Sequence, residues 1–153
     1  MLIGLISDTH GLMRPEALKA LAGVELILHA GDVGACAVLE ALRRIAPVRA
    51  VVGNVDDPDD PDLEPYVELV VGGTSIHVSH GHECGAPTPE KLLLRYPADV
   101  IIYGHTHRAL IRQSDARLVF NPGAAGPRRF DLKPSVGLLR ISGDGVDAEI
   151  VEL

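Results

Sequence analysis

Short apolar runs and amphipathic patterns alternate along the first third of the chain. The runs are rich in β-branched residues, which favours strands, whereas apolar residues three or four positions apart, as from Val38 to Ile45, indicate a helix face. The predicted elements are the strand Leu2–Ser7, the helix Pro15–Leu21, the strand Val24–His29, the helix Ala35–Ile45 and the strand Val48–Val52. This β-α-β-α-β order predicts a parallel sheet with right-handed crossovers.

Hairpin patterns dominate the remainder of the chain, where turn residues separate pairs of apolar runs. The predicted elements are paired strands at Tyr66–Val71 and Ser75–Ser79, a helix at Pro89–Tyr96, a strand at Asp99–Tyr103, and paired strands at Ala109–Gln113 and Leu118–Phe120 and at Ser135–Ile141 and Val146–Leu153. The proline- and acid-rich segment Asp56–Pro65 predicts an exposed connector, with a rim around a binding site as the alternative. Together the patterns predict an α/β fold of two packed sheets with helices outside, in one domain spanning residues 1–153.

Composition and charge narrow the class of protein. A chain of 153 residues that is 46% hydrophobic can form one core, and no stretch approaches the ~18 consecutive apolar residues of a membrane span. The first residues lack the basic region of a signal peptide, so we expect a cytoplasmic protein without a membrane partner. Cys36 and Cys84 form no Cys-x-x-Cys motif and are expected to be free thiols. The formal charge of −7 opposes tight nucleic-acid binding, although metal ions could still create a locally positive site.

Polar residues follow most of the predicted strands, and in α/β sheets ligands bind at the carboxyl ends of strands. These residues are Asp8, His10, Asp32, Asn54, His80, His82, His105, His107 and Asn121. A spacing of two in an extended chain points both side chains to the same side, so Asp8 with His10, and His105 with His107, are expected to form chelating pairs. Each residue alone could serve a turn, a helix cap or a buried structural role. Because turns do not require histidine, the whole set predicts a metal site.

Five motifs occur in a fixed order, namely Asp8-x-His10, Gly31-Asp32, Gly53-Asn54, His80-Gly81 and Gly104-His105-Thr106-His107. This series resembles the calcineurin-like metallophosphoesterase superfamily. The short chain is similar to the small bacterial and archaeal phosphodiesterases of that superfamily, and the retromer subunit of the same fold belongs near this group. The resemblance implies a four-layer α/β/β/α sandwich of two facing β-sheets flanked by helices.

The resemblance also implies two divalent metal ions as cofactors. One ion would be bound by Asp8, His10, Asp32 and His107, and the other by Asp32, Asn54, His80 and His105, with Asp32 as the bridge. A hydroxide between the two ions would attack phosphorus in line, which places Asp32 and Asn54 among the catalytic residues. Imidazole, carboxylate and amide ligands without thiolate suit transition metals, so we expect manganese first, with iron, nickel, cobalt and zinc as alternatives.

One position departs from the superfamily pattern. Many members carry a histidine directly after the motif asparagine, where it is thought to assist the leaving group, but this chain has Val55. His82 is the candidate replacement as a catalytic and phosphate-binding residue, with a supporting or surface role as the alternative. Without a strong acid, activity should favour diesters with good leaving groups, such as aryl or cyclic ones.

A late motif adds a candidate for substrate binding. Asn121-Pro122-Gly123 with Pro127-Arg128-Arg129 resembles a segment of the small phosphodiesterases. Arg128 could bind a phosphate oxygen in a planar fork, beside Asn54 and His82, or it could simply be solvated. His29 and His77 lie inside strand patterns, so structural roles are expected for both.

The leading hypothesis is a metal-dependent phosphoesterase, most favourably a phosphodiesterase, that hydrolyses a small phosphoester. The alternatives are a phosphomonoesterase and a non-catalytic interaction scaffold of the same fold. An oxygen-activating iron protein is disfavoured because its facial triad uses one metal, whereas ligands for two are present. The sequence does not determine the natural substrate, and it leaves a homo-oligomer open.

Overall fold

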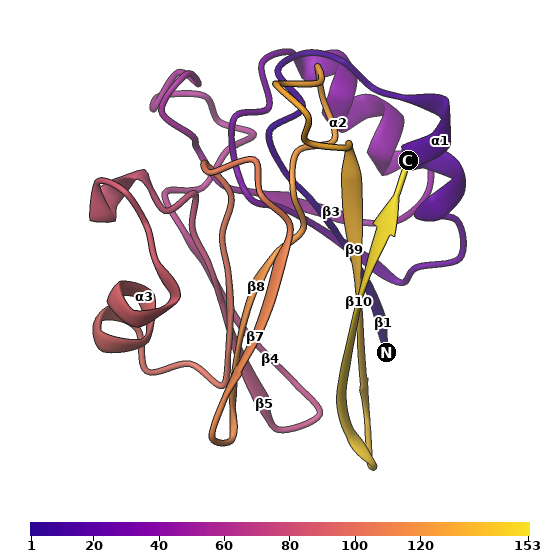
Figure 1. The fold of residues 1–153 in the computed structure, drawn as a ribbon. Helices are drawn as coiled ribbons and strands as arrows, with labels where there is room; N and C mark the ends of the chain where they lie inside the picture. The colour runs from indigo at the N-terminus through magenta and orange to yellow at the C-terminus, as the bar shows by residue number, and fades with distance from the viewer.

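The computed structural model describes residues 1–153, which form ten strands in two sheets and three α-helices (Figure 1). The first sheet contains β1 (Leu2–Ile6), β2 (Leu26–His29), β3 (Val48–Ala50), β9 (Ser135–Ser142) and β10 (Gly145–Glu152). The second contains β4 (Val67–Val71), β5 (Thr74–Val78), β6 (Val100–Ile102), β7 (Leu110–Ser114) and β8 (Arg117–Asn121). The helices are α1 (Pro15–Ala20), α2 (Cys36–Arg43) and α3 (Pro89–Arg95), with a short 3-10 helix at His82–Cys84.

Both sheets are mixed. In the first, with strand order β10-β9-β1-β2-β3, the strands β1, β2 and β3 are parallel, which confirms the prediction for the first third of the chain. The last hairpin returns to this sheet, and β9 pairs antiparallel with β1. In the second, with order β4-β5-β6-β8-β7, the three central strands are parallel and the two edge strands are antiparallel.

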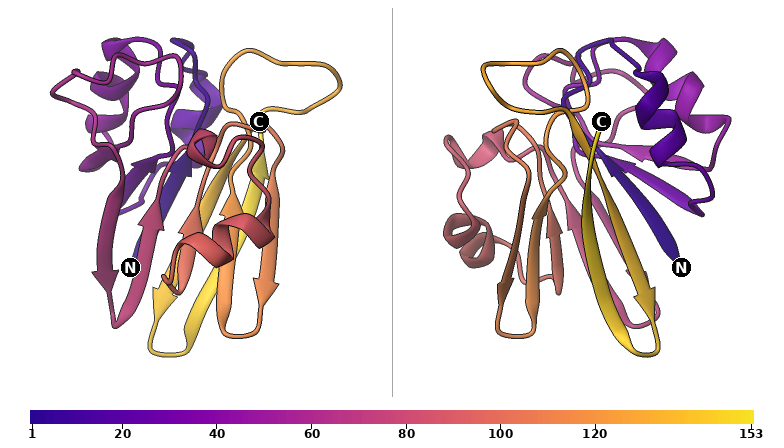
Figure 2. Two further views of the ribbon diagram at one scale, coloured as in Figure 1. Left: turned by 90° about the vertical axis from the view of Figure 1, so that its left-hand side faces the viewer. Right: turned by 45° about the vertical axis from the view of Figure 1, so that its right-hand side comes forward.

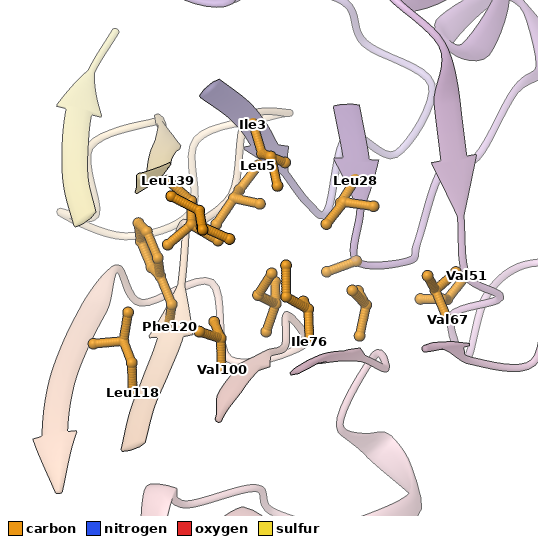
Figure 3. Packing of buried hydrophobic residues seen from close by; sticks show 14 residues of the cluster. Ile3, Leu5, Leu28, Val51, Val67, Ile76, Val100, Leu118, Phe120 and Leu139 are labelled. Atoms are coloured by element: carbon orange, nitrogen blue, oxygen red, sulfur yellow. The ribbon is translucent and has the colours of Figure 1, made fainter. Parts of the chain in front are cut away.

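The layers follow from the alternation of side chains along the strands. On β1, Ile3 and Leu5 point toward the second sheet, whereas Ile6 points toward the helices. The cluster between the sheets contains 14 buried residues, and Figure 3 shows side chains of both sheets meeting there. A second cluster joins the first sheet to α1 and α2, and a third joins the second sheet to α3. The predicted four-layer α/β/β/α sandwich is therefore confirmed (Figures 1 and 2).

The helices are short and depend on packing for stability. Pro15 and Pro89 occupy first-turn positions, where the missing N–H is not needed. The Thr88 hydroxyl caps α3 by accepting a hydrogen bond from the Lys91 amide at 3.3 Å. Helix α2 buries the stripe Val38, Leu39 and Leu42 against the first sheet. None of the helices combines the length and the apolar character needed to cross a membrane.

Candidate metal centre

The loops that follow β1, β2, β3, β5 and β6 converge at one end of the two sheets, and the Asp8 carboxylate lies at their centre. Its Oδ1 atom is 3.3 Å from Nε2 of His107 and 3.9 Å from Nε2 of both His10 and His80. These four residues come from three different loops, and Asp8 and His80 are almost fully buried. Asp8 could therefore contribute ligand atoms to more than one ion.

Asp32 lies between the two predicted ligand sets. Its Oδ2 atom is 3.5 Å from Nε2 of His10 and 3.3 Å from Nε2 of His80. The Asn54 amide oxygen is 3.0 Å from Nε2 of His80 and 3.0 Å from Nδ1 of His105. The structure thus brings all seven predicted ligand residues into one cluster.

Two overlapping groups in this cluster have ligand atoms within 4.8 Å of one another, which is the spacing that a metal site requires. They are Asp8 with His10 and His107, and Asp8 with Asp32 and His80. Asp8 is the member that these groups share, whereas the family resemblance makes Asp32 the bridge. The contacts of Asp32 Oδ2 with His10 and His80 suit the bridging role better, because each of those histidines belongs to a different predicted ion.

The expectation that the ligand pairs sit in extended chain is wrong. Of seven non-glycine residues with positive φ, five are predicted ligands, namely Asp8 (φ 53), His10 (φ 46), Asp32 (φ 54), His105 (φ 70) and His107 (φ 60). Left-handed backbone costs a non-glycine residue about 1 kcal/mol or more, and it persists where the surroundings enforce it. The side chains converge because the loops curl around the centre, and the alternation of a strand plays no part.

Buried polar atoms test whether these residues suit a cation. Asp8 Oδ1, His10 Nε2 and His107 Nδ1 are buried without a hydrogen-bond partner, although buried polar atoms are nearly always paired. The other Asp8 oxygen, Oδ2, accepts hydrogen bonds from the Ser7 hydroxyl at 2.7 Å and the His105 amide at 3.1 Å. One carboxylate oxygen is thus fixed by donors, and the other faces imidazole nitrogens, as a metal ligand would.

His80 adds a second argument for a cation. Its Nδ1 lies 2.7 Å from the Ala30 carbonyl oxygen, which makes Nδ1 the protonated nitrogen and leaves a lone pair on Nε2 of the neutral ring. In the neutral ring that lone pair would face oxygens of Asp32 and Asn54 at 3.3 and 3.0 Å, so either a second proton on Nε2 or a metal ion is needed to hold these three atoms together. A backbone carbonyl commonly orients a metal-binding histidine in this way. The residues therefore fit a metal ion.

The charges of the cluster also suit cation binding. Burial is the largest single influence and raises the pKa of Asp32, but the hydrogen bond and charge of His80, with smaller contributions from the Val55 amide and His10, together outweigh it and lower the pKa to about 2. Burial lowers the pKa of His80, but contact with Asp32 and the charge of Asp8 raise it above its ordinary value. Burial and the nearby His80 lower the pKa of His105. The carboxylates thus attract positive charge to the centre, which can be a proton or a metal ion.

Two glycines allow the loops to approach this closely. A Cβ on Gly53 would lie 2.0 Å from Asp32 Oδ1 and 2.2 Å from the Asp32 backbone nitrogen. A Cβ on Gly104 would lie 2.0 Å from the Ser7 hydroxyl and 2.8 Å from Asp8 Oδ2. No side chain fits at either position, which explains why a glycine precedes Asn54 and another precedes His105.

His29 has the structural role that its place in a strand predicts, and it joins two ligand loops. Its Nδ1 accepts a hydrogen bond from the Gly31 amide at 3.2 Å. Its Nε2 lies 3.0 Å from the Thr9 hydroxyl, which itself donates to the Val33 carbonyl oxygen at 2.9 Å, so Nε2 must be the protonated nitrogen. Both ring nitrogens are satisfied only in this neutral tautomer. Complete burial lowers the pKa of His29 to about 4.

Asp56 is an organising residue that the sequence analysis missed, because the segment Asp56–Pro65 was expected to be an exposed connector. The Asp56 carboxylate accepts hydrogen bonds from the Gly53, Val33 and Gly34 amides at 2.8, 3.1 and 3.0 Å. It therefore ties the loop after β2 to the loop after β3. An Asp three residues after a glycine at a strand end is a turn signal that could have identified it.

The two candidates for substrate contact lie near different histidines of the cluster. The ring of His82 is centred 5.3 Å from that of His80 and 6.3 Å from that of His105, and its side chain is partly exposed. Arg128 is exposed in the loop between β8 and β9 and lines a small hollow with His107. Val55, which replaces the expected acid, is exposed beside Asn54.

Comparison with known proteins identifies the class to which this fold and site belong. The model of the calcineurin-like phosphoesterase superfamily domain matches residues 1–144. The chain belongs to this superfamily, and the resemblance seen in its motifs is confirmed.

Individual relatives agree with this assignment. The chain is 40% identical over 162 aligned positions to a Methanothermobacter thermautotrophicus protein named "Probable metallophosphoesterase", with 99% of this chain and 92% of that protein covered. The fold of the present chain matches that of an archaeal phosphodiesterase with a TM-score of 0.80 at 24% identity. The match covers 99% of this chain and 100% of that one. The fold also matches that of wild-type Vps29 of Entamoeba histolytica complexed with Zn²⁺, with a TM-score of 0.80 at 25% identity and 99% of each chain covered.

Proposed function

We propose that this protein is a metal-dependent phosphodiesterase that hydrolyses a small phosphoester. Two divalent ions would be held by the predicted ligands, one by Asp8, His10, Asp32 and His107, and the other by Asp32, Asn54, His80 and His105. The observation that carries the proposal is the unpartnered Asp8 oxygen, which is buried among three imidazole nitrogens. No hydrogen-bond donor of the protein reaches this oxygen, and a metal ion bound among the imidazole nitrogens would give it a partner.

When bound, such ions polarise a phosphate oxygen and lower the pKa of water, which supplies a nucleophile near neutral pH. The chain contributes the positions of the groups around phosphorus. Asp32 belongs to both ligand sets and would therefore hold them next to the same phosphate. The Asn54 amide lies on the exposed side of the cluster and could also contact that phosphate. The overall reaction adds water across the ester: a P–O bond forms to the water oxygen, the P–O bond to the alcohol breaks, and the alcohol leaves with a proton.

His82 is the group we assign to the leaving oxygen. It stands beside His80 and His105 and is open to solvent, so it can exchange protons. Val55 cannot donate a proton, and the two histidines nearest to His82, His80 and His105, are predicted metal ligands. His82 should therefore matter most for esters whose alcohols are weak acids.

Manganese remains the proposed metal, with iron, nickel, cobalt and zinc as alternatives. The donor set of imidazole nitrogens and carboxylate and amide oxygens supports any of these ions. The Zn²⁺ complex of the Entamoeba histolytica Vps29 supports zinc as the next choice. Elemental analysis of purified protein after dialysis against each metal should show about two ions per chain.

The decisive experiment measures hydrolysis of bis(p-nitrophenyl) phosphate by metal-loaded and metal-stripped protein. We expect turnover that requires metal and is lost in Asp8→Asn, together with weakened metal binding by calorimetry. A series of aryl esters should show that His82→Gln makes the rate depend more steeply on the pKa of the leaving alcohol. If fully metal-loaded protein hydrolyses no phosphomonoester or diester, the interaction scaffold replaces the enzyme as the conclusion.

A further inference from the structure

The loop between β8 and β9 begins at the metal centre and then leaves the body of the protein. The Gly126 amide donates a hydrogen bond to the Asp8 carbonyl oxygen at 3.2 Å, and the Arg14 guanidinium donates to the Gly126 carbonyl oxygen at 3.0 and 3.2 Å. A Cβ on Gly126 would lie 2.3 Å from the Thr9 carbonyl oxygen, so the loop starts in tight contact with the ligand loop. Figure 2 shows residues beyond this point projecting past the ends of the strands. We call residues 127–133 the arginine loop.

The arginine loop and His107 line the same surface depressions. One small hollow is lined by His107, Arg128, Arg129 and Lys133, among others. A larger depression of about 500 Å³ is lined by residues that include His107, Arg108, Asp131, Lys133 and Glu152. A substrate that reaches a metal ion held by His107 therefore has room to extend over this loop.

The charge of this rim opposes that of the rest of the chain. Arg108, Arg128 and Arg129 are exposed and form neither an ion pair nor a side-chain hydrogen bond, whereas Lys133 is paired with Glu152 at 3.0 Å. The chain has a formal charge of −7, and the segment after Asn54 begins with Asp56 and a run of further aspartates. Asp131 in the same loop offsets one of these charges, and the remaining positive charge of the three unpaired arginines favours an anionic group in this direction.

Phe130 stands at the tip of the arginine loop with its ring in solvent. It is 91% exposed, whereas the only other phenylalanine, Phe120, is fully buried in the core between the sheets. Its φ of +53° is unfavourable for a bulky residue, and five of the other six non-glycine residues with positive φ surround the metal centre. An exposed aromatic ring beside arginines provides a platform on which a flat, electron-rich group can stack.

We propose that the arginine loop binds the non-reacting arm of a nucleotidic phosphodiester. The base of the substrate stacks on Phe130, and a second phosphate, which is not cleaved, pairs with Arg129. This inference rests on the proposed function and adds the substrate class to it. The reaction is the hydrolysis already described, with water adding to the phosphorus at the centre while the phosphate on the loop is unchanged.

The chemistry of the loop favours a nucleotide over other diesters. A choline or ethanolamine head group carries a cation, which the arginines would repel even where Phe130 attracted it. A glycerol or sugar arm has no flat surface to cover the Phe130 ring. A nucleotide offers both a base that can stack on the Phe130 ring and a phosphate that can pair with a guanidinium group.

Three p-nitrophenyl diesters with one leaving group test the proposal. They are methyl p-nitrophenyl phosphate, thymidine 5′-(p-nitrophenyl phosphate), and the same thymidine ester with a 3′-phosphate. We expect kcat/KM to rise along the series. Phe130→Ala should lower the preference for the thymidine esters over the methyl ester about tenfold, mainly through KM. Arg129→Gln should lower the further preference for the 3′-phosphate about tenfold.

Matched variants and a binding measurement separate this role from a general effect on the loop. Phe130→Tyr keeps the ring and should restore the preference, and Arg140→Gln, an exposed arginine on β9, should leave the series unchanged. Anisotropy of a fluorescent etheno-ADP should show about tenfold weaker binding to Phe130→Ala than to wild type or Phe130→Tyr.

The possible outcomes distinguish failure of this inference from failure of the proposed function. Hydrolysis of all three esters with preferences unaltered in Phe130→Ala and Arg129→Gln would overturn this inference and leave the proposed function intact. A change of oligomeric state in Phe130→Ala, in place of a change in preference, would make Phe130 an interface residue and also overturn it. Failure of the metal-loaded protein to hydrolyse any of the esters would overturn the proposed function and this inference together.

Discussion

The two ends of the sheets differ in what holds their connections together. At one end, tight hairpin turns join β4 to β5, β7 to β8 and β9 to β10 (Figure 1). A Cβ on Gly73 or Gly143 in these turns would meet no atom within 4 Å. At the other end, a Cβ on Gly31, Gly53 or Gly104 would come within 2.6 Å of a side chain from another loop.

Backbone strain also differs between the two ends of the sheets. Asp115 is the one non-glycine residue with positive φ in the hairpin turns, whereas five such residues surround the candidate metal centre. The hairpin turns are set by local conformation, and the loops of the centre are set by one another. The same kind of substitution should therefore have very different effects at the two ends.

The largest contrast should come from a carboxylate at each end. Asp32→Asn removes a proposed bridging anion and should lower metal-dependent hydrolysis by ~10³-fold, about 4 kcal/mol of transition-state stabilisation. Asp144→Asn, in the exposed turn between β9 and β10, should leave activity within about twofold. Steady-state kinetics on bis(p-nitrophenyl) phosphate with elemental analysis measures both. Activity of Asp32→Asn within about tenfold of wild type would exclude the bridging role.

A methyl group added at each end should give the next contrast. Gly53→Ala places a Cβ against the carboxylate and backbone of Asp32 and should destabilise the fold by about 3 kcal/mol. Gly143→Ala meets open space and should change the free energy of unfolding by no more than about 0.5 kcal/mol. Urea unfolding compares the two, and equal effects would show that the loops of the centre are looser than these contacts indicate.

Acidification should lower the free energy of unfolding because His29, at the metal-centre end, is buried in its neutral form. Its pKa is about 4 in the folded protein and about 6.5 in the unfolded chain, so the unfolded chain binds more protons between these values. Stability should therefore fall as pH decreases from 6.5 to 4, by about 2 to 3 kcal/mol from this residue alone. The measurement is urea unfolding across this range in wild type and His29→Gln. The variant should show a flatter pH dependence, and identical slopes would contradict the neutral, buried state of His29.

The smallest predicted effect concerns the tie between two loops. Asp56→Asn should weaken three hydrogen bonds to backbone amides and cost about 2 kcal/mol of stability. It should also reduce metal affinity about tenfold, because the loops carrying Asp32 and Asn54 lose their connection. Asp59→Asn, an exposed aspartate in the same segment, is the matched control in unfolding and calorimetry. Equal behaviour of both variants would restore the simple connector expected from the sequence.

The sequence by itself determined the strands, the helices and the residues of the candidate centre. Period-two and three-to-four spacings are local properties, so elements such as β1 and α2 could be predicted close to their observed bounds. The five motifs identified the family because each places a ligand-type side chain directly after a strand. The order of the five motifs along the chain matches that of the family, and this match is far more specific than any single residue.

Only the tertiary structure decided which strands belong to which sheet and how the predicted metal ligands are held in place. The last hairpin joins the first sheet beside β1, and no local pattern specifies that distant pairing. Positive φ at the ligand residues is enforced by surrounding loops, against the preference of the residues themselves. Asp56 serves as a tie because two loops meet at its carboxylate. These features depend on contacts between distant segments, whose free energy exists only once the chain has folded.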